Sequence, residues 1–256
     1  MADEEVVLDG WKAIEEAFQK VYTGQDDPKH YGTLIPWRLG GPDPLDGISI
    51  YDGGDYWHFV TFGLSELYEK ETDDPEWSGY GIEFTMRLKK GCYEDEEAEM
   101  RCVCGNLQNI AKITFNSGEL FQVWEWIYTG QKNGIDARHT SALTGFITVP
   151  DTLVPSIDTL NGHVDFVEFV GATDAELLKI QSKETDVREL FEKIGDVTDY
   201  GRKSVYRQYT VNGIFAAGIW KRTCPLDKQK KVCYNLFAVK FFPAADGGKN
   251  RKYVIS

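Results

Sequence analysis

The sequence lacks the features that would place it in a membrane, in a secretory pathway or in a disulfide framework. No apolar run reaches 18 residues, and the N-terminus MADEEVVLDG has neither the basic nor the apolar region of a signal peptide. Only five cysteines occur, an odd number at irregular positions, which is typical of reduced thiols in the cytosol. We therefore expect a cytoplasmic protein that makes no membrane contact.

Catalytic motifs are missing as well. The chain has no G-x-S-x-G, no G-x-x-x-x-G-K-[ST], no G-x-G-x-x-G and no H-E-x-x-H. The four histidines are scattered, and His58, between Trp57 and Phe59 in a strand-like segment, is predicted to be structural rather than a general base. We expect no catalytic residue and no cofactor. An unrecognised hydrolase is the least favoured alternative, because nothing places two acids in a cleft.

Two groups of potential metal ligands occur, and neither has the spacing of a metal site. Cys102 and Cys104 lie in a segment with helical spacing, where residues two apart point about 200° apart and cannot share a zinc ion. We expect two reduced thiols on different helix faces. The acids of DPLDGISIYDGGDY lack the D-x-[DN]-x-[DN]-G spacing of a calcium loop and are typical of turns. No metal is expected.

Charge is distributed unevenly along the chain. Residues 1–200 hold 39 acidic and 16 basic residues, whereas residues 201–256 hold 2 acidic and 12 basic residues. Negative charge over most of the surface repels phosphates, which argues against nucleic-acid binding, and it attracts a basic protein partner. The same charge is equally consistent with a role in solubility alone.

The length and composition are those of a folded chain with one large domain. Of the 256 residues 42% are hydrophobic and 13% are aromatic, which is enough for a substantial core. No repeat and no low-complexity tract occurs. We expect a domain over residues 1–195. A basic, strand-rich extension over residues 196–256 is expected either to pack on this domain or to form a small appendage.

Hydrophobic periodicity predicts the elements of this domain. Helical spacing covers residues 6–22, 94–115 and 173–194, the last with a candidate break near Thr185. Strand-like patterns cover residues 48–51, 57–62, 80–88, 121–128, 145–149 and 164–170, and they return beyond residue 200. Prolines and glycines exclude regular structure from residues 35–47.

The segment 80–88 shows the clearest alternation. Its apolar residues are predicted to face the core and its polar residues to face solvent. The apolar set is Ile82, Phe84, Met86 and Leu88, and the polar set is Glu83, Thr85 and Arg87. Because strands and helices do not alternate strictly, the pattern predicts an α+β fold with a mixed, largely antiparallel central sheet flanked by helices.

Three long motifs carry a resemblance to a known family. They are LGGPDPLD with the following ISIY (residues 39–51), WHFVTFGLSELY (57–68) and SGYGIEFTMRL (78–88). In order and spacing they resemble the Suppressor of fused family. The resemblance is sharp over residues 31–90 and extends to about residue 180. It implies the fold of that family's N-terminal domain.

The resemblance also implies a function without catalysis. Metazoan relatives capture a short peptide of a transcription factor as an added strand, and bacterial single-domain relatives look like immunity proteins that neutralise a toxin. We therefore expect a protein-binding module, foremost an immunity or antitoxin-type protein that neutralises a basic toxin domain. The alternative is an adaptor that captures an extended peptide by strand addition.

The family's peptide-contacting positions transfer in part. A tyrosine on the relatives' helix corresponds to Ile113 here, and an aspartate after that helix corresponds to Glu125, within Trp124-Glu-Trp126. The acid is kept and the tyrosine is lost. On a strand, Trp124, Trp126 and Tyr128 share one face and Glu125 points the other way. Either the aromatics are core and Glu125 is merely solvated, or Glu125 faces a partner groove flanked by Ile113, Trp124 and Trp126.

Overall fold

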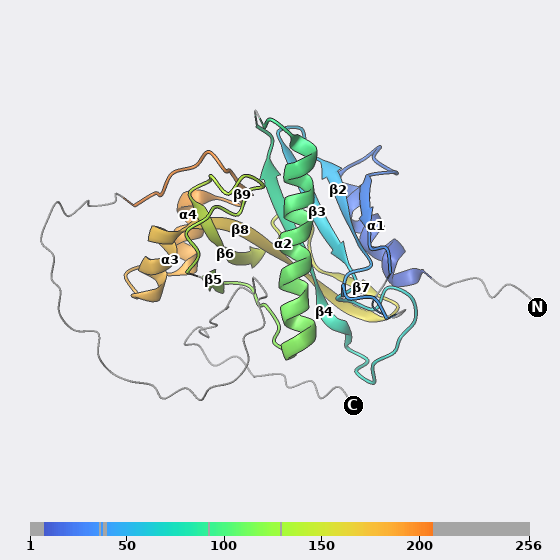
Figure 1. The fold of residues 1–256 in the computed structure, drawn as a ribbon. Coiled ribbons are helices and arrows are strands. Elements are labelled where there is room, and N and C mark those ends of the chain that lie inside the picture. Colours follow the sequence, from blue (N-terminus) through green and yellow to red (C-terminus); the bar gives the residue numbers. More distant parts are fainter. Residues whose placement is uncertain (1–7, 36, 38–39, 92, 129, 207–256) are drawn as a thin grey trace, which may run out of the picture.

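The computed structural model describes residues 8–206, apart from residues 36, 38–39, 92 and 129. Within this range a nine-stranded sheet carries helices on both faces (Figure 1). The helices are α1 (Asp9–Val21), α2 (Glu96–Ser117), α3 (Asp174–Gln181) and α4 (Val187–Ile194). The strands are β1 (Lys29–Gly32), β2 (Gly47–Asp52), β3 (Tyr56–Phe62), β4 (Trp77–Lys89), β5 (Trp126–Tyr128), β6 (Leu143–Pro150), β7 (Ile157–Thr159), β8 (Gly162–Thr173) and β9 (Val197–Thr198).

The sheet is mixed and mostly antiparallel. Its main path runs β1-β2-β3-β4-β8-β6-β5, with β7 paired to β8 and β9 paired to β4. Only β8 and β9 run parallel to β4 among the described strands. The predicted α+β fold is confirmed. Along this path β1 and β5 are the two outer strands, so they are the edges at which a further strand could pair.

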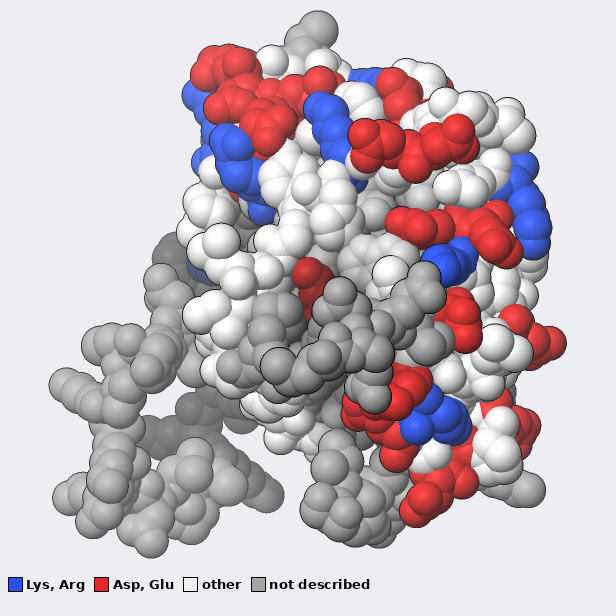
Figure 2. Space-filling view, turned by 90° about the vertical axis from the view of Figure 1, so that its right-hand side faces the viewer, with Lys and Arg blue, Asp and Glu red and all other residues white. Residues whose placement is uncertain are grey.

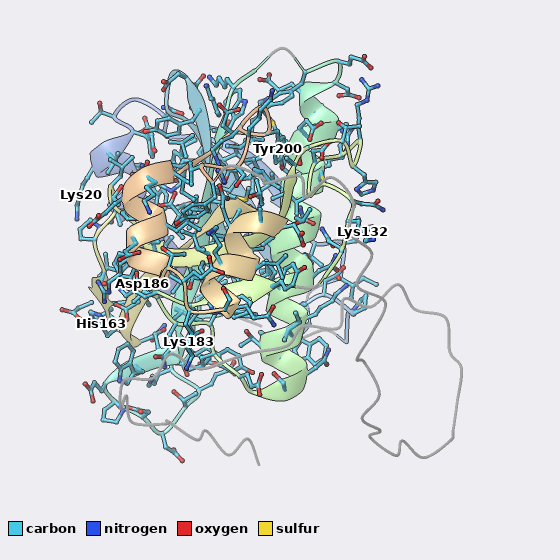
Figure 3. All side chains as sticks on the ribbon, turned by 90° about the vertical axis from the view of Figure 1, so that its left-hand side faces the viewer. Lys20, Lys132, His163, Lys183, Asp186 and Tyr200 are labelled. Carbon is cyan, nitrogen blue, oxygen red and sulfur yellow. The ribbon has the colours of Figure 1, made fainter. Side chains whose placement is uncertain are left out.

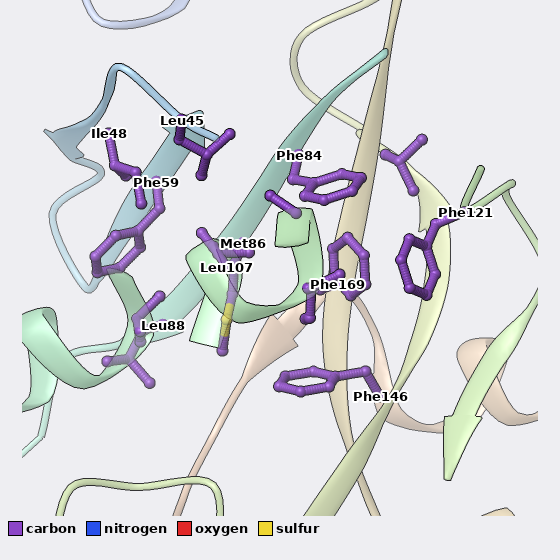
Figure 4. Packing of buried hydrophobic residues seen from close by; sticks show 14 of the residues in the cluster. Leu45, Ile48, Phe59, Phe84, Met86, Leu88, Leu107, Phe121, Phe146 and Phe169 are labelled. Carbon is purple, nitrogen blue, oxygen red and sulfur yellow. The ribbon is translucent and has the colours of Figure 1, made fainter. Parts of the chain in front are cut away.

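The main core lies between the sheet and α2, which crosses one face of it (Figure 1). The four apolar residues of the alternating segment in β4 are at most 7% exposed and face this core, as predicted. Phe84 and Phe169 pack edge to face with ring centroids 4.9 Å apart, and Phe121 and Phe146 surround them (Figure 4). The helical stripe that meets them is Met100, Val103, Leu107, Ile110 and Ala111.

The opposite face of the sheet is covered at both ends. Helix α1 buries Ile14 and Phe18 against β2, β3 and β8. Helices α3 and α4 bury Leu177 and Leu190 against β6 and β8. Figure 3 shows the molecule from the side that carries α3 and α4, so both helices lie in front, with Asp186 at the start of α4. The helix expected over residues 173–194 is therefore two helices, separated at the predicted break.

The prediction of a solvated face on β4 is wrong. Glu83 and Thr85 are fully buried and Arg87 is 3% exposed. Their side chains lie on the face of the sheet opposite to α2, the face that also carries α1, α3 and α4. The guanidinium of Arg87 donates two hydrogen bonds, of 2.7 and 2.6 Å, to the carboxylate of Glu168 on β8. The alternation of polar and apolar residues is real, but the polar face is buried instead of solvated. Glu83 and Arg87 each have their own hydrogen-bond partners, whereas the Thr85 hydroxyl has none among the described residues.

Glu83 joins two of the motifs that carry the family resemblance. Its Oε1 accepts hydrogen bonds from the backbone N–H groups of Gly63, Leu64 and Ser65 at 2.9–3.1 Å and from the Ser65 hydroxyl at 2.7 Å. Its Oε2 accepts from the hydroxyl of Thr61 at 2.6 Å. Gly63 has a φ of 136°, and a Cβ there would lie within 2.9 Å of the backbone of residues 45–46. One carboxyl group thus fixes the corner after β3.

The segment predicted as one strand over residues 121–128 is also corrected. Only β5 is a strand, and Trp124 before it has a φ of 70°, a conformation that L residues rarely adopt. The backbone N–H of Trp124 still donates to the carbonyl of Thr148 at 2.7 Å, so the segment follows β6 irregularly. Three short strands, β1, β7 and β9, have no predicted counterpart, because two to four residues show no measurable period.

The start of the predicted extension packs on the sheet. Strand β9 pairs with Arg87 and Leu88 of β4, and the ring of Tyr200 packs against the main core. Arg202 donates hydrogen bonds from its two terminal guanidinium nitrogens to the buried carboxylate of Glu176, at 2.6 and 2.9 Å. The strand-like patterns beyond residue 206 lie outside the described residues, and the boundary at residue 195 stays a prediction.

Candidate functional site

The outer strand β5 offers the first candidate edge. It pairs with β6 through Trp126↔Ile147, Ile127↔Phe146 and Tyr128↔Gly145. No described strand pairs with its other side. Gly145 permits this pairing, because a Cβ there would lie 2.3 Å from the carbonyl oxygen of Ile127. Among the described residues β5 is thus an outer strand, the kind of sheet edge at which an added strand can pair.

Glu125 lies directly before this edge and is half-buried. Its Oε2 accepts a hydrogen bond of 3.0 Å from the backbone N–H of Gln122, and its own N–H donates to Thr148 Oγ1 at 2.9 Å. No donor among the described residues reaches its Oε1. Burial raises the pKa of Glu125, and the Gln122 N–H opposes this only in part. A cationic or histidine donor would satisfy the remaining oxygen.

The aromatic residues around Glu125 pack toward α4. Trp124 lies edge to face with Phe191 at 5.8 Å, and the guanidinium of Arg188 lies 4.0 Å from its ring centroid. Trp126 and Tyr128 contact the same hydrophobic cluster under α3 and α4. The Tyr128 hydroxyl donates to Asp174, which raises the pKa of that phenol to about 12. Trp124 and Trp126 thus lie together and are held in place.

Ile113 lies apart from these aromatics. It is on α2 and packs against the main core, whereas Trp124 and Trp126 belong to the cluster on the opposite face of the sheet. The four residues predicted for the partner site are therefore divided between the two faces. Their role in binding stays a prediction.

Sequence reasoning missed a buried chain of polar groups around His58. The Tyr22 hydroxyl lies 2.7 Å from His58 Nδ1, and His58 Nε2 lies 2.8 Å from a carboxylate oxygen of Asp151. Burial lowers the pKa of His58. A neutral imidazole accepts from Tyr22 and donates to Asp151, so all three groups are satisfied. His58 is 0% exposed. The predicted structural role suits this geometry, because no substrate reaches the ring.

The cysteines and acids considered as metal ligands have other partners. Cys102 Sγ lies 3.3 Å from the carbonyl oxygen of Ile135, while Cys104 packs toward the main core, so the two thiols lie on different helix faces as predicted. Both are free thiols. Asp52 accepts a hydrogen bond of 2.8 Å from the backbone N–H of Gly54, which is turn geometry.

In the part of the chain that is described, no helix has both the length and the apolar character needed to span a bilayer.

Comparisons with known proteins agree on one family. The Suppressor of fused protein (SUFU) family matches residues 41–203. The Suppressor of fused homologs of Homo sapiens and Mus musculus are each 29% identical over 187 residues, which is 67% of this chain and 37% of theirs. The chain thus spans little more than a third of the length of these curated relatives.

Solved structures give the same result. A Sufu–Fu complex crystal structure superposes with a TM-score of 0.66 at 29% identity, covering 77% of this chain and 92% of that one. Drosophila Suppressor of Fused superposes with a TM-score of 0.64 at 27% identity, covering 79% of this chain and 53% of that one. The first of these relatives is thus seen in a complex with a protein partner, Fu, and the matched relatives are not known enzymes.

Proposed function

Because the chain belongs to the Suppressor of fused family, whose shared domain is a protein-interaction module, we propose that it captures an extended segment of a protein partner along β5. The observation that carries this proposal is the position of β5 as an outer strand, with no further described strand paired to it, beside the half-buried carboxylate of Glu125. No step of this function needs a cofactor or a catalytic residue.

Strand addition would divide the work between backbone and side chains. Backbone groups on the outer side of β5 would supply affinity for any extended segment, and Glu125 would select a lysine, arginine or histidine on that segment. The raised pKa of Glu125 supports this, because a carboxylate held away from water gains most from a cationic partner. Trp124, fixed between Arg188 and Phe191, would form a rigid wall beside the added strand.

The charge of the chain supports a basic partner. Residues 1–200 hold 39 acidic against 16 basic residues. Such a surface accelerates association with a cationic protein and makes that association sensitive to salt. Within this function we therefore place foremost an immunity role, in which the partner is a basic toxin domain. The second candidate is an adaptor that holds an ordinary regulatory protein.

Substitution of Glu125 tests the proposed site. Partners are recovered with the purified chain as bait, and binding is then measured by calorimetry at two salt concentrations. Glu125→Gln keeps the shape of the side chain and removes its charge, and we expect it to weaken binding about ten-fold or more at both salts. The matched control is Glu71→Gln, an exposed carboxylate, for which only the association rate and its salt dependence should change.

Each result has a definite meaning. An unchanged dissociation constant for Glu125→Gln at both salts removes Glu125 from the site. A partner with toxin activity, encoded next to this chain and blocked by it, supports the immunity role. If the recovered partner has no toxin activity and Glu125→Gln weakens its binding to the same extent, the result supports the adaptor role.

A further inference from the structure

A second candidate binding surface lies at β1, at the other end of the sheet from β5. Two cavities flank this strand, of about 510 and 500 Å³. The first is lined by residues 24–29, Ile50, Asp52 and Trp57. The second is lined mainly by apolar groups of Tyr31, residues 33–35, Leu45, Ile48 and α2.

Both cavities open on the same face of the sheet. Lys29 lines the first and pairs with Ile50, whereas Tyr31 lines the second and pairs with Ile48. Residues two apart on a strand point to the same face, and both isoleucines belong to the core beneath α2. A strand added to the outer edge of β1 would therefore place alternate side chains over both cavities.

The first cavity suits a cation. Asp26, Asp27 and Asp52 line it together with Lys29, and Lys90 forms an ion pair with Asp52, so these five side chains leave one net negative charge. Its aromatic wall already attracts cations, since the Nζ atoms of Lys29 and Lys90 lie 5.0 and 3.8 Å from the Trp57 ring centroid. The side of the molecule that carries α1 and β2 shows more Asp and Glu than Lys and Arg (Figure 2).

The second cavity suits an apolar side chain. Leu34 is 100% exposed, Ile35 is 53% exposed, and Trp37 just beyond them is 48% exposed. Three of the eight large hydrophobic residues that are exposed in the described chain thus lie within four positions. An apolar patch beside an unpaired strand edge is the usual mark of a protein-binding surface.

We propose that β1 and its two cavities bind an extended segment of a partner protein that carries a lysine or arginine and a large apolar residue four positions apart. Residues i and i+4 of a strand lie on one face about 13 Å apart. The same spacing separates Asp27, which lines the acidic cavity, from Tyr31, which lines the apolar cavity. This site is independent of the one proposed at β5, because it uses the opposite edge of the sheet.

Defined peptides test the proposal on the full chain. The probes are capped seven-residue threonine peptides with lysine at position 2, valine at position 4 and leucine at position 6, together with the reversed order. Calorimetry gives the affinity, and NMR shifts of the labelled protein locate binding. We expect one of the two orders to bind at β1 at least about ten-fold more tightly than versions with glutamine for lysine or serine for leucine.

Surface variants separate the two cavities. Leu34→Ser combined with Ile35→Ser should weaken the peptide about ten-fold at every salt concentration. Asp26→Asn combined with Asp27→Asn should weaken it about three-fold at low salt and hardly at all at high salt. These side chains are exposed, so folding should be unchanged, which thermal melting checks. The matched control is Leu160→Ser, an 84% exposed leucine outside both cavities.

Several outcomes would overturn the proposal. Equal binding of the substituted peptides, or full binding by the Leu34 and Ile35 variant, shows that the cavities do not select the segment. Loss of peptide binding in Glu125→Gln assigns the peptide to β5 instead. If no peptide binds and the Leu34 and Ile35 substitutions convert a dimer to a monomer, the occupant of this surface is a second copy of the chain.

Discussion

The corner organised by Glu83 gives the sharpest prediction for stability. Burial raises the pKa of this carboxyl to about 7, against the opposing effect of its hydrogen-bond donors from Thr61, Gly63 and Ser65. The folded state therefore holds a proton on Glu83 more firmly than the unfolded chain, whose ordinary pKa is 4.5. This contribution to stability is complete below pH 4.5 and is lost as the pH rises through 7.

The magnitude follows from the two pKa values. A rise from 4.5 to about 7 corresponds to about 3 kcal/mol of unfolding free energy. Glutamine keeps the shape but cannot titrate. In acid, the neutral carboxyl can donate its one proton to Thr61 Oγ1, whereas the amide of Glu83→Gln has a second N–H with no acceptor. We expect Glu83→Gln to cost about 1–3 kcal/mol at pH 5. At pH 8 the cost should be about 2–3 kcal/mol smaller.

Urea unfolding followed by tryptophan fluorescence and circular dichroism at pH 5, 6.5 and 8 measures this directly. The control is Glu71→Gln, an exposed carboxyl, which should cost nothing measurable at any of the three values. If the cost of Glu83→Gln is constant or grows toward pH 8, Glu83 is ionised in the folded state. The hydrogen bonds to its carboxylate would then outweigh the effect of burial on its pKa.

Three further predictions concern the core and the buried charges. Phe84→Ala should lower the unfolding free energy by about 3–5 kcal/mol in urea melts, because it removes a fully buried ring packed on Phe169. Burial alone would raise the pKa of Asp136, but hydrogen bonds donated by residues 140–141 outweigh burial and hold the pKa at about 2. The wild-type protein should therefore lose unfolding free energy as this carboxylate is protonated between pH 4 and 2. In acid titrations, Asp136→Asn should make that loss smaller by about 1–2 kcal/mol. Glu168→Leu should cost about 3–5 kcal/mol, because it removes the buried carboxylate that accepts two hydrogen bonds from Arg87 and leaves the guanidinium with only Thr152 and the partly exposed Asp196. Adding Arg87→Met should recover most of that loss in a double-mutant cycle.

Elements with a long hydrophobic period were predictable from the sequence. Helix α2 and strand β4 each show enough turns or alternations for one face to be identified, and both faces meet in the main core. The polar face of β4 could not be assigned in the same way. Thr61 lies 22 positions from Glu83, and Glu168 lies 81 positions from Arg87, so the partners that make burial possible are invisible to a local pattern.

The candidate site was predictable only in outline. The sequence placed an acid and two tryptophans beside a strand, but an alternating pattern assumes extended backbone at every position. Trp124 departs from it with a φ of 70°, a strain of about 1–3 kcal/mol that contacts from Arg188 and Phe191 offset. These two residues lie on α4, more than 60 positions along the chain, and no signal in the strand segment identifies them.

The roles of the family motifs also limit what can be transferred from the relatives. Glu83 and the corner at Gly63 are buried and hold β3 against β4, so the motifs that identify the family specify the scaffold. Binding would occur at β1 and β5, where side chains at the sheet edges can change without disturbing that corner. Ile113, which the resemblance predicts to stand where the relatives have a tyrosine, lies on α2 against the main core, and its role in binding stays a prediction. The fold can therefore be carried over from family membership, whereas the partner must be determined from the residues at these two edges.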